Sequence, residues 1–186
     1  LGCGTGATAL DFARRGLRVF AVDNSPTMCL LARQKARRAR LPVRVLCADM
    51  RRFRLPEPVD LVTCEFASLN HLARRDDLGR VAQAVARALR PGGYFLFDVN
   101  TPLSFQHQYT ATYWFENPEF KLVLRGSYDA RRGKARLNFE WFLPQGRLWR
   151  HQRERVENVC WNDAEIRRAL RRAGFAHLRV WDGIDV

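Results

Sequence analysis

Four short apolar runs, separated from one another by helical patterns, constrain the fold more than any other feature of the sequence. The runs lie at residues 17–23, 43–49, 59–66 and 94–100. Continuous apolar strands that alternate with helices are typical of a parallel sheet covered on both faces. Ligands of such sheets bind beyond the carboxyl ends of the strands. Every run delivers polar residues to that edge, namely Asp23, Asp49, Glu65, Asp98 and Asn100.

Helical periodicity fills the stretches around these runs. Helices are predicted at residues 7–16, 24–40, 75–90 and 162–174, and a last strand at residues 176–182. Ser25 is the expected N-cap of the second helix, with Pro26 at its first helical position. Pro91 stops the third helix, and Asn162 or Asp163 caps the fourth.

The pattern changes after Pro102 to period-two alternation. Turn signals at Asn117-Pro118, Arg132-Gly133 and Gln145-Gly146 predict three or four antiparallel strands joined by hairpins. We therefore expect an α/β core at residues 1–103, an inserted antiparallel flap at residues 104–160, and a return to the core at residues 161–186, all within one domain.

Composition excludes several classes of protein. A chain of 186 residues is long enough for one well-packed domain. No apolar run approaches the ~20 residues of a membrane span, and no charged-then-apolar signal segment appears. The five cysteines form no CxxC pair and have no histidine at metal-ligand spacing. We therefore predict no metal site, and reduced thiols in a cytoplasm.

The formal charge of +13 comes almost wholly from arginine, because lysine occurs only at Lys35, Lys121 and Lys134. A basic domain invites nucleic-acid binding through counterion release. The arginines are spread over every segment, which favours a solvated surface instead. Nucleic acid therefore stays an alternative partner that the sequence does not favour.

The chain opens on LGCGTG, directly before the first helical pattern. Glycines let a backbone approach a ligand closely, and a helix N-terminus offers free N–H groups. Gly2, Gly4 and Ala7 fit a dinucleotide fingerprint, and Asp23 follows at about the spacing of a ribose-binding acid. This stretch alone does not decide whether the ligand is a nicotinamide dinucleotide or another nucleotide cofactor.

Five stretches taken together resemble the class I S-adenosylmethionine-dependent methyltransferases. They are LGCGTG, VDNSPTM, CADMRRF, LRPGGYFLFD and WNDAEIRRALRRAGF, in that order along the chain. The resemblance implies a Rossmann-like, doubly wound, mostly parallel sheet of seven strands that binds S-adenosylmethionine. It favours this cofactor over a dinucleotide, for which Asp49 and the PGG entry into the fourth apolar run have no particular use.

The resemblance also implies roles for individual residues. Asp23 takes both ribose hydroxyls, Asp49 accepts from the adenine amino group, and Glu65 faces the methionine part of the cofactor. The implied cofactor-binding residues are Gly2, Cys3, Gly4, Gly6, Asp23, Asn24, Met28, Asp49, Met50, Glu65 and Phe66.

One departure from the family concerns its first strand, which normally ends in an acidic residue just before this leucine. The chain begins at Leu1, so the first strand is expected to be truncated. The second and fourth family strands then lack their shared neighbour. We expect upstream coding sequence that ends in an apolar run plus Asp or Glu, and further sequence after Val186.

The inserted flap resembles the small-molecule members of the family, including amine and sugar-amine N-methyltransferases. An N or O acceptor on a small molecule is therefore expected. Two alternatives remain: an RNA or protein methyltransferase that uses the basic surface, and a non-catalytic regulator that only binds the cofactor. Methyl transfer needs a base only if the acceptor arrives protonated. The candidate bases are His71 and Asp98, and the candidate substrate residues are Asn70, Asn100, Tyr109 and Tyr113.

Overall fold

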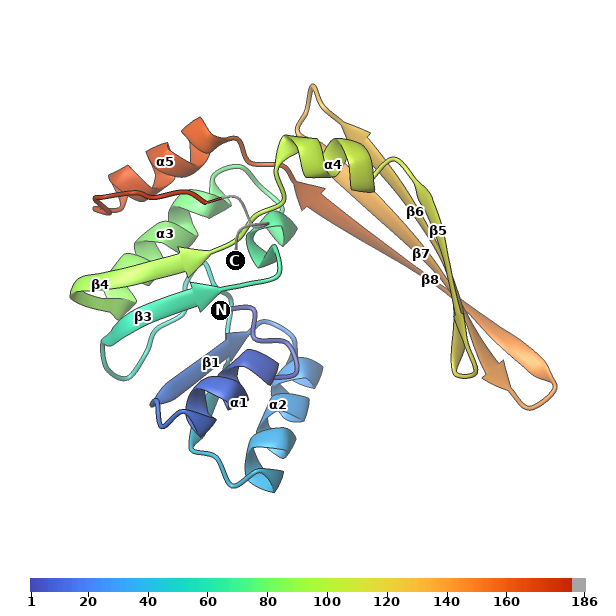
Figure 1. Cartoon of the computed structure of the whole chain (residues 1–186), viewed down its shortest axis with the longest axis horizontal. Helices are drawn as coiled ribbons and strands as arrows, with labels where there is room; N and C mark the ends of the chain where they lie inside the picture. The colour runs from blue at the N-terminus through green and yellow to red at the C-terminus, as the bar shows by residue number, and fades with distance from the viewer. Residues whose placement is uncertain (182–186) are drawn as a thin grey trace. The chain divides into compact units, whose positions relative to one another are not determined.

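The computed structural model describes residues 1–181 (Figure 1). The chain divides into two compact units. The first, here called the α/β unit, comprises residues 1–69, 76–98 and, of the described chain, 166–181. The second, here called the flap unit, comprises residues 70–75 and 99–165. No helix within residues 1–181 is long and apolar enough to cross a membrane.

The α/β unit holds two parallel strand pairs with helices packed on them (Figure 1). Its strands are β1 (Val19–Asp23), β2 (Val43–Cys47), β3 (Val59–Cys64) and β4 (Leu89–Phe97). Its helices are α1 (Ala7–Arg14), α2 (Pro26–Arg38), α3 (Asp77–Ala88) and most of α5 (Asp163–Arg172). β1 pairs with β2 and β3 pairs with β4. Among the described residues no strand joins β1 to β3.

The helix ends follow the capping signals in the sequence. The Ser25 hydroxyl accepts a hydrogen bond from the Met28 N–H at 3.3 Å, and Pro26 opens α2. Asn162 and Glu165 form a reciprocal box before α5: each side chain accepts from the other's backbone N–H, at 2.8 and 3.0 Å. The core side of α3 buries Leu78, Val81 and Val85 completely or nearly so. The four predicted helices are therefore confirmed, but the predicted stop of the third helix at Pro91 is wrong. Helix α3 ends at Ala88 and β4 begins at Leu89, so Pro91 lies within the strand.

The predicted last strand is wrong over residues 176–181, which form no strand, and residue 182 lies outside the described residues. His177 has a left-handed backbone with φ 52°, which breaks an extended path. β propensity alone does not make a strand, because the backbone must also pair with a neighbour.

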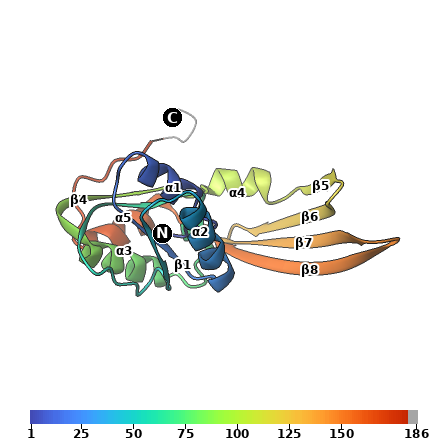
Figure 2. The same cartoon turned by 90° about the horizontal axis from the view of Figure 1, so that it is seen from below.

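The flap unit is a four-stranded antiparallel sheet in chain order, joined at the three predicted turns (Figure 2). Its strands are β5 (Thr112–Asn117), β6 (Phe120–Asp129), β7 (Lys134–Gln145) and β8 (Leu148–Val159). The sequence did not predict α4 (Pro102–Gln108), which precedes β5. Thr101 caps α4 by accepting from the Ser104 N–H at 3.3 Å, and this Thr-Pro pair was the available signal.

Helix α4 packs closely on β6. The rings of Phe105 and Tyr128 stack with centroids 5.5 Å apart, and Phe105 is fully buried. A Cβ on Gly126 would lie 2.3 Å from the carbonyl oxygen of Tyr109. Only glycine therefore lets the backbone at the end of α4 come this close to the sheet.

Candidate functional site

The glycine turn before α1 has three left-handed residues, Gly2, Gly4 and Gly6, with φ of 63°, 52° and 85°. A Cβ on Gly2 would lie 2.7 Å from the Ser68 Oγ, and a Cβ on Gly6 would lie 3.1 Å from the Ala32 Cβ. A Cβ on Gly4 would meet nothing within 4 Å. Gly2 and Gly6 therefore serve the packing of the turn, whereas Gly4 faces open space that a ligand can enter.

Asp23, at the end of β1, ties this turn to the start of α2. Its Oδ2 accepts the Gly4 N–H at 2.7 Å, and its Oδ1 accepts the Ser25 N–H at 2.8 Å. Each carboxylate oxygen has about two acceptor positions. One position on each oxygen is thus left for a further donor, an arrangement that suits two neighbouring hydroxyls.

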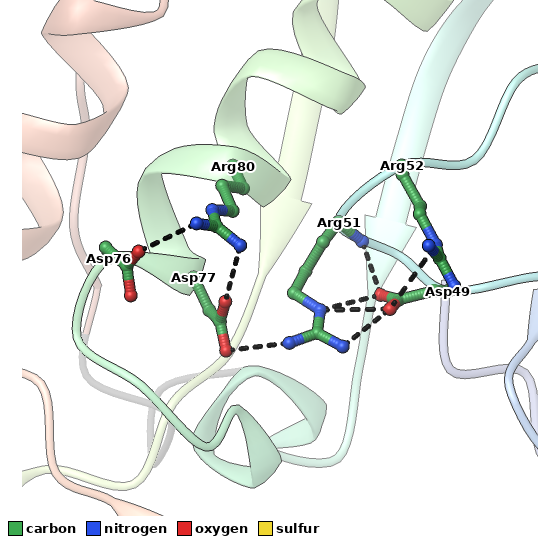
Figure 3. Close-up of polar contacts among 6 residues, drawn as sticks. All are labelled: Asp49, Arg51, Arg52, Asp76, Asp77 and Arg80. Carbon is green, nitrogen blue, oxygen red and sulfur yellow. Dashed lines mark hydrogen bonds and ion pairs between the residues drawn. The ribbon is translucent and has the colours of Figure 1, made fainter.

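Asp49 follows β2 and lies beside the same edge, because the Ala48 N–H donates to the Asp23 carbonyl at 2.8 Å. The Asp49 carboxylate accepts from the Arg51 backbone N–H at 2.9 Å and from the Arg51 guanidinium (Figure 3). These bonds lower the pKa of Asp49 and outweigh the opposing effect of burial. Asp49 is therefore an ionised, fixed acceptor, and Arg51 is a part of the site that sequence reasoning missed.

At the end of β3, Glu65 Oε2 accepts the Thr8 hydroxyl of α1 at 2.9 Å. The next two residues, Phe66 and Ala67, have left-handed backbones with φ of 57° and 54°. Such strain in two consecutive non-glycine residues persists only where the surroundings hold it. Asp98 does so at the end of β4, since its Oδ2 accepts the Ala67 N–H at 2.7 Å. This leaves Phe66 83% exposed.

A groove of about 720 Å³ runs between β1 and β3. Gly2, Gly4 and Glu65 line it together with mostly apolar residues of the two strands, whereas Asp23 and Asp49 lie outside its lining. The Leu1 amino group donates to the Thr63 carbonyl at 2.6 Å, and the Cys3 N–H donates to the Val22 carbonyl at 3.0 Å. Residues 1–3 thus bridge the two strand pairs at the glycine-turn end of the groove.

The remaining predicted cofactor residues lie at the glycine turn or at the start of α2. The Met50 methyl carbon would lie 3.8 Å from a Cβ on Gly2. Burial raises the pKa of the Cys3 thiol to about 11, so this side chain is neutral. Asn24 and Met28 are exposed before and within the first turn of α2.

Three of the four predicted substrate residues join a polar network in the flap unit. Asn70 is fully buried: its Nδ2 donates to the Val159 carbonyl at 2.8 Å and its Oδ1 accepts the Asn100 N–H at 2.9 Å. The side-chain amides of Asn100 and Asn158 both donate to the Tyr109 hydroxyl, at 3.2 and 3.1 Å. These contacts hold α4, β8 and the segment after β3 together, and the sequence carried no signal for Asn158.

Two further candidates of the flap unit lie outside this network: Tyr113, the fourth predicted substrate residue, and His71, a predicted base. Tyr113 lies on β5 and is 38% exposed. His71 ends a short 3₁₀ helix (Ser68–His71). Desolvation lowers the pKa of its imidazole below the ordinary histidine value, so His71 is largely neutral at pH 7.

A doubly wound α/β unit with a glycine turn at a helix N-terminus and acids after two neighbouring strands defines a nucleotide-cofactor-binding domain. Residues 1–93 match the family described as "Methyltransferase domain", and the chain belongs to that family.

Known relatives agree with this assignment. The chain is 25% identical over 182 residues to the putative methyltransferase YqeM of Bacillus subtilis, a match that covers 97% of this chain and 73% of that protein. It is 30% identical over 189 residues to the carboxy-S-adenosyl-L-methionine synthase of Erwinia tasmaniensis, covering 97% of this chain and 68% of that protein.

Solved structures agree as well. A S-adenosylmethionine-dependent methyltransferase from Clostridium acetobutylicum superimposes with a TM-score of 0.83 at 24% identity, covering 92% of this chain and 70% of that chain. CalS10, an amino pentose methyltransferase from Micromonospora echinaspora, was solved with S-adenosylmethionine bound; its TM-score is 0.75 at 28% identity, over 93% of this chain and 72% of that chain. The protein is an S-adenosylmethionine-dependent methyltransferase, so the cofactor choice that the glycine turn left open is resolved.

Proposed function

We propose that this enzyme methylates a nitrogen or oxygen of a small-molecule acceptor, with the cofactor held at the carboxyl edge of the α/β unit. The observation that carries the cofactor site is Asp23, whose two oxygens each keep one acceptor position beside an open Gly4. In this proposal the ribose hydroxyls donate to Asp23 and the adenine amino group donates to Asp49. Glu65 and Phe66 lie next to the methionine part.

When bound, the cofactor supplies a methyl group on a sulfonium, which a nucleophile displaces in line. The protein's own work is to orient the acceptor and, where the acceptor arrives protonated, to remove a proton. His71 suits the second task because its neutral imidazole accepts a proton at pH 7. Asp98 suits it less, because its Oδ2 already holds the Ala67 N–H, and we assign it to positioning.

The small-molecule acceptor is supported by CalS10, whose name records an amino pentose. The likeness to carboxy-S-adenosyl-L-methionine synthases supports only a shared cofactor, and it makes product analysis necessary. An RNA or protein acceptor and a binding-only regulator remain the alternatives. We propose a cytoplasmic location on the sequence grounds given above.

Calorimetry tests the cofactor site. S-adenosylmethionine and S-adenosylhomocysteine are expected to bind, and binding of NAD alone would overturn the proposal. Asp23→Ala leaves the ribose hydroxyls unpaired and frees the Gly4 N–H, so the affinity for S-adenosylhomocysteine should fall by about 2–3 kcal/mol. Asp11→Ala is the matched control, because the Asp11 side chain is half exposed and pairs with Arg15, one helical turn further along the chain.

Mass spectrometry of the products tests the acceptor. The enzyme is incubated with S-adenosylmethionine and a panel of amino sugars, other amines, carboxylates and RNA. A methylated amino sugar or amine is expected. Methylated RNA would favour the macromolecular alternative, whereas tight binding without turnover on any acceptor would favour the regulator.

A further inference from the structure

Arg51 lies between two carboxylates that come from different elements of the α/β unit (Figure 3). Its Nε donates to both oxygens of Asp49, at 2.9 and 3.0 Å, and its Nη2 donates to Asp49 Oδ2 at 2.6 Å. Its Nη1 donates to Asp77 Oδ2 at 3.0 Å. The planar guanidinium thus fixes the plane of the Asp49 carboxylate and is itself held from the far side.

Arg51 is held on the side away from Asp49 by Asp77, at the start of α3. Asp77 is the first residue of α3 and its side chain is fully buried, where the positive end of the helix favours its charge. Arg80 lies 3.8 Å from Asp77 Oδ1 and 3.0 Å from Asp76, which continues the ion-pair chain along α3 (Figure 3). The Asp49 carboxylate therefore takes its orientation from α3 through Arg51.

The acceptor positions of Asp49 are nearly all taken. Two ionised oxygens offer about four positions. The Arg51 backbone N–H binds Oδ1, the single Nε hydrogen is shared between Oδ1 and Oδ2, and Nη2 binds Oδ2. Arg52 does not add another bond, because its Nε is 3.9 Å from Oδ2, beyond hydrogen-bond length. Three hydrogens of Arg51 thus meet about four acceptor positions of the carboxylate, so about one position is left, which fits a single N–H donor.

We infer that Arg51 is a positioning residue that makes the cofactor site selective for adenine, by presenting one fixed acceptor of Asp49 to the amino group of the base. The inference rests on the proposed placement of adenine beside Asp49. Hypoxanthine carries a carbonyl oxygen where adenine carries this amino group, so it would face the carboxylate acceptor to acceptor. Without the Arg51 guanidinium the carboxylate keeps only the hydrogen bond from the backbone N–H, so its orientation is less fixed and this selection weakens.

The test compares S-adenosylhomocysteine with S-inosylhomocysteine by calorimetry. Both probes share the ribose and homocysteine parts, so damage to the fold or to other contacts lowers both affinities together and leaves their ratio unchanged. In the wild-type protein the adenosyl probe should bind about tenfold or more tightly than the inosyl probe, because the latter leaves a buried acceptor unpaired. The ratio in Arg51→Ala should fall at least threefold below the wild-type ratio.

Arg52→Ala is the matched control, since this neighbouring arginine side chain is 85% exposed and makes no hydrogen bond to Asp49. It should keep the wild-type ratio. Arg51→Lys, which keeps the charge but loses the planar fork, is measured beside Arg51→Ala and replaces it if the alanine variant does not fold. Its ratio should fall as well.

The outcomes separate the inference from the proposed function. If the wild-type protein prefers the adenosyl probe and both Arg51 variants keep that ratio, the positioning role is overturned. The positioning role is also overturned if Arg52→Ala lowers the ratio as much as Arg51→Ala does. If the wild-type protein binds neither probe, the proposed cofactor site itself fails.

Discussion

Gly4→Ala gives the sharpest test of where the cofactor passes the glycine turn. The free protein has room for the new methyl group, because a Cβ at this position meets nothing within 4 Å. Only the left-handed backbone, with φ 52°, opposes alanine, at a cost of about 1–2 kcal/mol. For a domain of this size the melting temperature should then fall by about 2–8 °C.

Cofactor binding should respond more strongly, because the methyl group takes up space that the proposal gives to the ligand. Forcing one extra methyl group into a filled site costs about 1–3 kcal/mol, which corresponds to a loss of about 5- to 150-fold in affinity. Calorimetric titration with S-adenosylhomocysteine measures this loss.

Gly16→Ala is the matched control. Gly16 follows α1 with φ 80°, and a Cβ there also meets nothing within 4 Å. Its melting temperature should fall similarly while its affinity for S-adenosylhomocysteine stays at the wild-type value. If Gly4→Ala binds as tightly as the Gly16 variant, the cofactor does not pass Gly4 and the placement is wrong.

Three further predictions concern single side chains. Asp98→Ala removes the acceptor of the Ala67 N–H and should lower the free energy of unfolding by about 1–2 kcal/mol in urea titrations. An unchanged midpoint would show that Asp98 does not hold the left-handed backbone at Phe66 and Ala67. If His71 is the base, its lowered pKa places the acid limb of the kcat/KM profile below about pH 6.5. The variant His71→Gln should abolish that limb. An acid limb above this pH in the wild-type enzyme refutes the assignment. The stability that Arg51 gives by lowering the pKa of Asp49 is fully present above about pH 4 and is lost as the pH falls through the lowered value. The gap in unfolding free energy between the wild-type protein and Arg51→Ala should therefore narrow in acid, and a gap independent of pH would contradict the ion-pair account.

Local signals predicted most of the secondary structure correctly. The Ser25-Pro26 cap, the Asn162 cap and the three hairpin turns each act within a few residues, so their effect is readable along the chain. Where a segment depends on partners far along the chain, local signals did not predict its structure. Residues 176–181 have strand-like composition but form no ladder. Helix α4 forms because Phe105 and Tyr109 pack against β6.

The same division holds for the candidate site. The sequence determined the order of the strands along the chain and the acids that follow them. Hydrophobic periodicity sets which residues end a strand, and parallel strands share one carboxyl edge. The sequence also determined the glycine turn.

Only the tertiary structure decided what each of these side chains contacts. It showed that Asp23 keeps acceptor positions on both oxygens, that Asp98 holds the bend at Ala67, and that Arg51 links Asp49 to α3. It also placed Asn70, Asn100 and Tyr109 in a packing network of the flap unit. The hydrogen bonds from Arg51 to Asp77 and from Asn100 to Asn70 join residues 26 and 30 positions apart. Such bonds arise only when the chain has folded, so no local pattern records them.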